Sequence, residues 1–112
     1  MVADFATQIA QDRVWFLGSD AQVSGFIVFY PREADMFLEN VAVRPEWHGT
    51  GVGKRLIAFC EATARNLGLA RVCLYTNAAM TRNLSIYPHL GYRETDRRSE
   101  DGFHRVYFEK QL

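Results

Sequence analysis

The sequence predicts a mixed α/β domain of the α+β type, with a twisted, mostly antiparallel sheet and one β-α-β crossover. Runs rich in Val, Ile, Phe and Tyr are separated by short turn signals, which is typical of strands. Two segments with helical periodicity interrupt these runs, and a glycine-rich turn precedes the longer one. With 112 residues, the chain has room for a single domain, residues 1–112.

The first part of the chain predicts a short helix followed by three strands. The helix is expected within residues 1–13, where apolar side chains recur on one side over about two turns. Pro31 is expected to end the second strand, because proline cannot donate a hydrogen bond to a sheet. The three strands are expected at residues 14–17, 22–30 and 35–43.

The second part predicts two helices, a strand between them and a closing hairpin. The first helix follows the glycine turn and is expected to end at about Leu67, before Gly68. Its apolar stripe recurs at i, i+4, i+8 and i+11, on Leu56, Cys60, Ala64 and Leu67. The remaining elements are expected at residues 71–76 for the strand, 77–90 for the helix, and 92–97 and 104–110 for the hairpin.

Charge and composition exclude several classes of function. The 13 basic and 13 acidic residues give a formal net charge of zero, which predicts no nucleic-acid partner. No apolar run approaches the ~18 residues of a membrane span, which predicts no membrane partner. Cys60 and Cys73 lie in apolar runs without metal-ligand spacing. Reduced, buried thiols, no metal site and a cytoplasmic location are therefore expected.

The segment from His48 to Lys54, His-Gly-Thr-Gly-Val-Gly-Lys, connects a predicted strand to a predicted helix. Unpaired backbone amides and the positive end of the helix dipole meet at such a turn, which suits a phosphate or pyrophosphate. A P-loop is excluded, because Arg55 follows Gly53-Lys54 where Ser or Thr is required. The glycine spacing also fails the GxGxxG dinucleotide fingerprint. A plain flexible turn that caps the helix is the alternative.

Two motifs in a fixed order add to this interpretation. The first is the strand end Val41-Ala42-Val43, then Pro45 and the glycine turn. The second motif is Tyr87-Pro88-His89-Leu90-Gly91-Tyr92, which a predicted helix and a predicted strand separate from the first. Together they resemble the GCN5-related N-acetyltransferase (GNAT) family, whose signatures are Arg/Gln-x-x-Gly-x-Gly/Ala after a bulged strand and Tyr-x-x-x-Gly-Phe/Tyr downstream. The resemblance covers residues 14–110.

The chain departs from the family pattern in three places. His48 stands where the family usually has Arg or Gln, and Met80 stands where many relatives have Asn, seven residues before the tyrosine. The usual N-terminal strand and helices do not fit into residues 1–13, so a short form is expected, or a start codon missed upstream. The strand at residues 14–17 is then an exposed edge, and a homodimer that covers it is expected.

The resemblance implies that acetyl-CoA is the co-substrate, without a metal. Its pyrophosphate would lie on the amides of the glycine turn. Its pantetheine would lie like an extra strand beside the third strand, which a bulge near Val41 would separate from the strand at residues 71–76. The cofactor-binding residues expected from the resemblance are Val41, Ala42, Val43, His48, Gly49, Thr50, Gly51, Val52, Gly53, Lys54, Asn83 and Tyr87.

The resemblance also implies direct acetyl transfer to a primary amine of a small molecule or peptide, without an acyl-enzyme. Tyr87 is the expected general acid for the leaving thiolate, and a core aromatic role is its alternative. Glu39 is the expected general base, because strand alternation places it on the face of Phe37 and Val41. Its alternative is to bind a cationic substrate or make a structural hydrogen bond. For the whole chain, the alternative is a non-catalytic acyl-CoA-binding module with an incomplete acceptor site.

Overall fold

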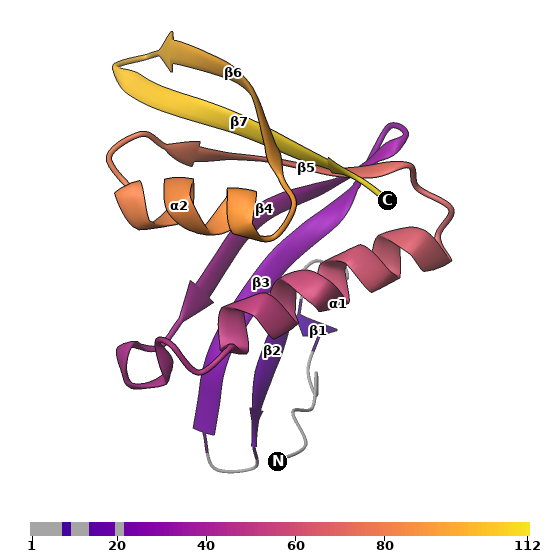
Figure 1. The fold of residues 1–112 in the computed structure, drawn as a ribbon. Helices are drawn as coiled ribbons and strands as arrows, with labels where there is room; N and C mark the ends of the chain where they lie inside the picture. Colours follow the sequence, from indigo (N-terminus) through magenta and orange to yellow (C-terminus); the bar gives the residue numbers. More distant parts are fainter. Residues whose placement is uncertain (1–7, 10–13, 20–21) are drawn as a thin grey trace.

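A computed structural model describes residues 8–9, 14–19 and 22–112 of the chain. These residues form one seven-stranded sheet and two helices (Figure 1). A short 3-10 turn at Pro45–Trp47 lies between the fourth strand and the first helix. The elements are β1 (Gln8–Ile9), β2 (Val14–Ser19), β3 (Gln22–Arg32), β4 (Asp35–Val43), α1 (Val52–Asn66), β5 (Arg71–Asn77), α2 (Thr81–His89), β6 (Arg93–Glu100) and β7 (Phe103–Gln111).

The sheet has the strand order β1-β2-β3-β4-β5-β7-β6. Every neighbouring pair is antiparallel except β4 and β5, which are parallel and joined through α1. The predicted fold class, a mostly antiparallel sheet with one β-α-β crossover, is therefore confirmed.

The core lies between the two helices and the sheet face that they cover. On α1 the predicted stripe residues Leu56, Cys60 and Ala64 are fully buried. Leu67 is 58% exposed, contrary to the prediction, because α1 ends at Asn66 and the left-handed Gly68 turns the chain away. Neither α1 nor α2, the helices of the described residues, is long and apolar enough to cross a membrane.

The parallel strands β4 and β5 separate soon after they pair. Their register contains only two residue pairs, Met36 with Val72 and Phe37 with Cys73. Beyond these pairs the strands diverge toward the glycine turn and α2 (Figure 1). The expected separation of these two strands is therefore present, and it leaves main-chain groups of β4 without a strand partner on that side.

A bulge in β4 accompanies this separation. On the neighbouring strand β3, Val28 lies opposite Asn40 and Phe29 lies opposite Leu38. Glu39 is thus an extra residue in β4, which bends the strand and changes the direction of the side chains that follow. The predicted bulge is confirmed, but it is centred two residues earlier than expected.

The predicted N-terminal helix is wrong where the structure describes it. Gln8–Ile9 form β1 and pair with β2, Gln8 opposite Trp15 and Ile9 opposite Val14. A weakly periodic helix of two turns is marginal by itself, so pairing with a neighbouring strand is favoured. Part of the edge that was expected to be exposed is therefore covered. The rest of residues 1–13 lies outside the described residues, and the homodimer stays a prediction.

The strand β3 continues through Pro31 to Arg32, where the sequence predicted its end. Its register with β2 stops at Val28, but its register with β4 continues to Arg32. A missing N–H group is tolerated where a strand has a neighbour on one side only. Pro31 therefore lies in the part of β3 that pairs with β4 alone, as far as the described residues show.

The second helix begins later than predicted. Asn77 is the last residue of β5, and its side-chain Oδ1 accepts a hydrogen bond of 2.8 Å from the Ala79 N–H group. This local turn competes with helix formation, as is common for asparagine. The helix α2 therefore starts at Thr81, four residues after the predicted start.

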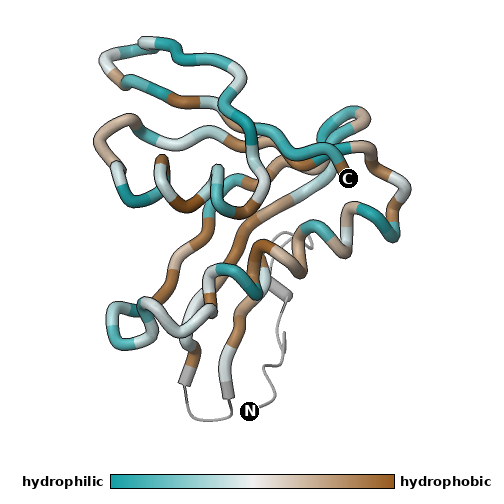
Figure 2. Tube along the Cα trace, in the orientation of Figure 1, coloured by the Kyte–Doolittle hydropathy of each residue, from teal (hydrophilic) through white to brown (hydrophobic). Residues whose placement is uncertain are grey.

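The closing hairpin is longer and tighter than predicted. Asp101 and Gly102 both have positive φ, 52° and 82°, so a two-residue turn replaces the expected longer one. The edge strand β6 is hydrophilic along its length (Figure 2). Ion pairs Arg97–Glu94 at 2.8 Å and Arg98–Asp96 at 2.7 Å cover it. Such a charged edge discourages pairing with another strand.

Candidate functional site

The glycine turn places unpaired amides at the start of α1. Gly49 and Gly51 have φ values of 79° and 89°, a left-handed conformation that favours glycine. The first hydrogen bond within the helix runs from the Arg55 N–H group to the Gly51 carbonyl, at 3.0 Å. The N–H groups of Val52 to Lys54 therefore have no partner inside α1 and point out of its end. Together with the helix dipole, they favour an anion there.

A groove of about 690 Å³ runs from the glycine turn to α2. The end of β4 and the start of α1 form one wall, and α2 forms the other. All the residues expected to bind the cofactor line this groove except Thr50. The Thr50 hydroxyl instead donates a hydrogen bond to the Trp47 carbonyl, back toward the 3-10 turn.

His48 connects the two walls of the groove. Its Nδ1 lies 3.0 Å from Nη1 of Arg82 on α2, and its Nε2 lies 3.0 Å from the carbonyl oxygen of Val43 on β4. A guanidinium can only donate, so Nδ1 accepts this bond, and Nε2 carries the proton that is donated to Val43. The imidazole thus holds the Arg82 guanidinium beside the glycine turn.

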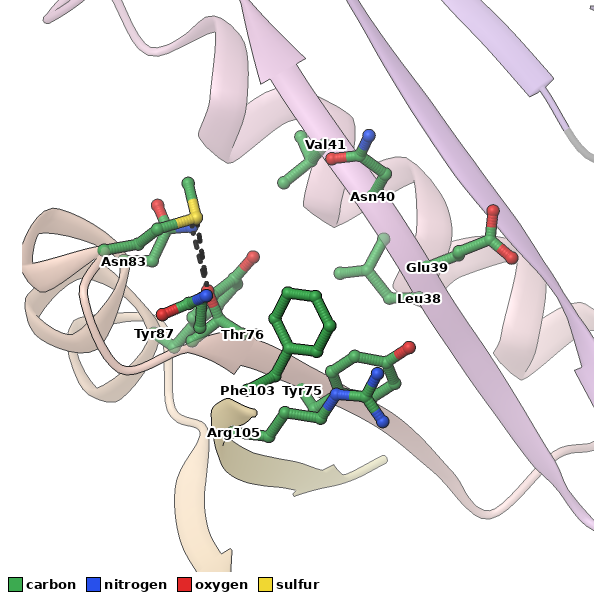
Figure 3. A pocket seen from close by; sticks show the side chains of 12 residues that line it. Leu38, Glu39, Asn40, Val41, Tyr75, Thr76, Asn83, Tyr87, Phe103 and Arg105 are labelled. Atoms are coloured by element: carbon green, nitrogen blue, oxygen red, sulfur yellow. Dashed lines mark hydrogen bonds between the residues drawn. The ribbon is translucent and has the colours of Figure 1, made fainter. Parts of the chain in front are cut away.

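A second cavity, of about 270 Å³, lies where β4 and β5 separate (Figure 3). Residues of β4, β5, α2 and β7 line it. Four side chains line both this cavity and the groove, so they lie between the two: Val41, Met80, Asn83 and Tyr87. A ligand in the groove and a ligand in the cavity would therefore meet at this set of residues.

Tyr87 is a buried tyrosine at the junction of the groove and the cavity. Its ring packs against Tyr92 and Phe108, with centroid distances of 5.8 Å and 5.6 Å. Its hydroxyl has no hydrogen-bond partner among residues 8–9, 14–19 and 22–112, so it is available to a ligand. Burial raises the pKa of Tyr87 to about 12, and the hydroxyl therefore keeps its proton at neutral pH.

Glu39 lines the second cavity from the bulge in β4. Its Oε1 accepts a hydrogen bond of 3.3 Å from the Tyr30 hydroxyl. The expectation that Glu39 shares a face with both Phe37 and Val41 is wrong for Val41. Because the bulge interrupts the alternation, Val41 packs against the core, while Glu39 stays on the face where the rings of Tyr30 and Phe37 contact at 5.5 Å.

Asn83 lies one helical turn before Tyr87 and fixes α2 against β5. Its Nδ2 donates a hydrogen bond of 3.2 Å to the Thr76 hydroxyl oxygen. Met80, which stands where many relatives have Asn, contributes only a sulfur, 3.8 Å from Thr76 Oγ1 and from Asn83 Nδ2. Sulfur is a weak acceptor, so Thr76 and Asn83 provide the stronger polar contacts on this wall.

Sequence reasoning missed several polar or aromatic residues at the two hollows, and four of them bear on the chemistry of the site. Arg82 lines the groove, and Asn77, Phe103 and Arg105 line the cavity. They come from α2, β5 and β7, and no motif or spacing connects them to the glycine turn. Only the pairing of β5 with β7 and the packing of α2 bring them there, so no local signal could have identified them.

Sequence comparisons relate the chain to acetyltransferases. The family model for the acetyltransferase (GNAT) domain matches residues 10–94. Mycothiol acetyltransferase of Pseudarthrobacter chlorophenolicus is 41% identical over 56 residues, 50% of this chain and 17% of that protein. Aminoglycoside N(6')-acetyltransferase type 1 of Stenotrophomonas maltophilia is 31% identical over 61 residues, 54% of this chain and 40% of that protein. The matches thus span less than half the length of either relative.

Solved structures share the fold. A GNAT family acetyltransferase from Elizabethkingia anophelis, solved with acetyl-CoA bound, superposes with a TM-score of 0.80. The superposition covers 88% of this chain and 75% of that chain, at 21% sequence identity.

Proposed function

Because the chain belongs to the GNAT acetyltransferase family, we propose that it binds acetyl-CoA and transfers the acetyl group directly to a primary amine of a small molecule or peptide. The observation that carries this proposal is the continuity of the site. The groove leads from the unpaired amides of the glycine turn to Tyr87, and the second cavity adjoins it there. The related structure that holds acetyl-CoA supports the choice of co-substrate.

The two ends of the groove suit the two ends of the cofactor. The N–H groups of Val52 to Lys54 would bind the pyrophosphate, with the Arg82 guanidinium as an additional cation. The pantetheine would lie along residues 41–43, because β4 has no pairing with β5 beyond Phe37. An extended ligand can use the free main-chain groups of such a strand.

The reaction needs three proton movements, because an ammonium group loses two protons on becoming an amide nitrogen. The neutral amine nitrogen attacks the thioester carbon, the nitrogen of the tetrahedral intermediate then gives its second proton to water, and the C–S bond breaks to give the amide and a thiolate. We assign to Glu39 the removal of the ammonium proton, directly or through a water molecule, because Glu39 is the acidic residue among those that line the cavity. We assign to the protonated Tyr87 hydroxyl the protonation of the thiolate sulfur, because it lies between cavity and groove.

The test is amine-dependent release of free thiol from acetyl-CoA, measured with a panel of primary amines. We expect Tyr87→Phe and Glu39→Gln to lower kcat by about 10²- to 10⁴-fold, as for the loss of an acid or a base, with little change in the Kd of CoA. Glu94→Gln is the matched control for Glu39→Gln, because the Glu94 carboxylate pairs with Arg97 on the edge strand β6 and lines neither hollow.

Two outcomes would contradict the assignment. Wild-type kcat in both Tyr87→Phe and Glu39→Gln would remove these residues from the chemistry. Binding of CoA without thiol release to any amine would favour the non-catalytic acyl-CoA-binding module instead.

A further inference from the structure

Building on the proposed function, we propose that the acceptor is a small amine that also carries a carboxylate. In this assignment Glu39 receives the ammonium group, and Arg105 with Asn77 receives the carboxylate. Among the described residues, two charged side chains line the cavity beside Tyr87: the acidic Glu39 and the basic Arg105. They come from β4 and β7, on the two sides of the gap between the separating strands.

Arg105 is held in place without being fully neutralised. Its guanidinium carbon lies 4.6 Å from the centroid of the Tyr75 ring, which fixes its plane by a cation-π contact. The nearest carboxylate oxygen, Oε1 of Glu100, is 3.8 Å from Arg105 Nη1 and also accepts a 2.8 Å bond from the Tyr107 hydroxyl. By contrast, Arg97 and Arg98 on β6 make ion pairs of 2.8 and 2.7 Å. Arg105 therefore retains N–H donors for a carboxylate in the cavity.

Asn77 provides a second donor at the same place. It lies directly opposite Arg105 in the antiparallel β5–β7 register, so both side chains project from the same face of the sheet. Its Oδ1 is occupied by the Ala79 N–H group at 2.8 Å. Its Nδ2 has no partner among the described residues, so it can donate. The two residues thus place a guanidinium and an amide N–H group on one face of the sheet, where both can donate to an anion.

The remaining walls suit a short carbon skeleton. Tyr75 and Phe103 are exposed aromatic side chains of β5 and β7 that line the cavity (Figure 3). The volume of about 270 Å³ fits a molecule of amino-acid size. A polycationic amine would bring additional positive charge toward Arg105, whereas an amine with a carboxylate matches both charged residues.

The experiment compares amines that differ only by a carboxylate. Lysine is paired with cadaverine and phenylalanine with phenethylamine, and kcat/KM for thiol release is measured for each. We expect kcat/KM to be at least about tenfold higher for the amine that carries the carboxylate. We expect Arg105→Gln to remove this difference, because it lowers kcat/KM for that amine and leaves kcat/KM for its partner unchanged. Arg97→Gln, on the exposed face of the same hairpin, is the matched control and should retain the ratio. Arg105→Lys, which keeps the charge without the bidentate geometry, should fall between the two.

Equal kcat/KM within each pair, or an equal loss for both members in Arg105→Gln, would overturn the inference. If no amine releases thiol, the proposed function fails, and the acceptor site is then tested by calorimetric titration of the same four compounds into the CoA-bound protein. Binding of lysine and phenylalanine, lost in Arg105→Gln, would support the carboxylate site. Equal or absent binding of all four would overturn it.

Discussion

At the scale of single residues, His48 and Arg82 form a hydrogen-bonded pair across the groove. His48 replaces the Arg or Gln that is usual in this family, and its neutral imidazole brings no charge of its own to the glycine turn. It instead accepts a 3.0 Å bond from Arg82 and donates one to the Val43 carbonyl. Arg82 of α2 thus adds a positive charge to that of Lys54 at the turn, and the imidazole sets the position of Arg82.

This pair makes a prediction about cofactor affinity. A charge-assisted hydrogen bond contributes about 1.5–3 kcal/mol, so Arg82→Ala should raise the Kd of CoA by roughly 10- to 100-fold. His48→Ala should also raise the Kd of CoA, but by a smaller factor, because it removes only the hydrogen bond that positions Arg82. Titration calorimetry with CoA and with pantetheine, which lacks phosphates, separates these effects. An equal loss of affinity for pantetheine would show that Arg82 does not act on the phosphates.

The same residues show what a sequence can and cannot reveal. Tyr87 and the glycine turn were predicted because each belongs to a motif of fixed spacing within one segment. Arg82, Asn77 and Arg105 were missed because their roles depend on contacts between segments that are far apart in the chain. Glu39 was predicted as a site residue, but the prediction that Val41 shares its face was wrong. A bulge shifts the alternation of side chains by one residue, and no local feature of the sequence signals it.

At the scale of elements, two glycines have different tasks in positioning the groove. A Cβ atom on Gly53 would lie 3.5 Å from Val43 Cγ2, an ordinary contact, and Gly53 faces the groove. A Cβ atom on Gly25 would lie 2.7 Å from the Ala42 carbonyl oxygen and 3.1 Å from Leu56 Cδ1. Gly25 therefore permits the close approach of β3, β4 and α1, whereas Gly53 leaves room for a ligand at the amides.

Alanine substitutions at these glycines should separate binding from stability. Gly53→Ala should leave the free energy of unfolding unchanged or slightly higher, since alanine favours a helix, but it should weaken CoA binding by covering the amides. Gly25→Ala should destabilise the fold by about 1–3 kcal/mol, because atoms must shift to admit the methyl group. Urea denaturation and CoA titration of both variants check this. Unchanged CoA affinity in Gly53→Ala would place the cofactor elsewhere.

Elements were predicted well where the pattern was long and poorly where it was short. The stripe of α1 extends over most of its 15 residues, and the helix was found with its end one residue off. The stretch containing Gln8–Ile9 has barely two turns of periodicity, and tertiary pairing with β2 overrides it. The start of α2 was missed because the Asn77 side chain closes a local turn.

At the scale of the whole molecule, the thiol and tyrosine hydroxyl groups in the fold make the free energy of unfolding depend on pH in the alkaline range. The predicted burial of both thiols is wrong for Cys73, which is only partly buried because it lies beside Asp35, on the other face of β5 from the buried Val72 and Leu74. Partial burial raises the pKa of the Cys73 thiol to about 11, and burial raises that of the Tyr87 hydroxyl to about 12. It also raises the pKa of Cys60 and of Tyr92, whose hydroxyl donates a 2.9 Å bond to Glu61. The ordinary values are 9.0 for a thiol and 10.0 for a tyrosine. Above those values the unfolded chain loses protons that the folded chain keeps.

The free energy of unfolding should therefore fall as pH rises. These groups have no effect on its slope while both states stay protonated, and the loss should begin at about pH 9 and steepen above about pH 10. Urea denaturation at a series of pH values measures it. Tyr92→Phe should reduce the slope above about pH 10. If the free energy of unfolding stays constant from pH 8 to about pH 11, the folded chain does not keep these side chains protonated, and the account of them is wrong.

The groove and the second cavity meet at Tyr87, and the proposed reaction depends on that junction. A crystal structure of the chain with CoA bound measures it. We predict that the pyrophosphate lies on the amides of Val52 to Lys54 and that the sulfur lies within hydrogen-bonding distance of the Tyr87 hydroxyl, facing the cavity. A sulfur that points away from Tyr87, or a cofactor outside the groove, would contradict the proposed transfer.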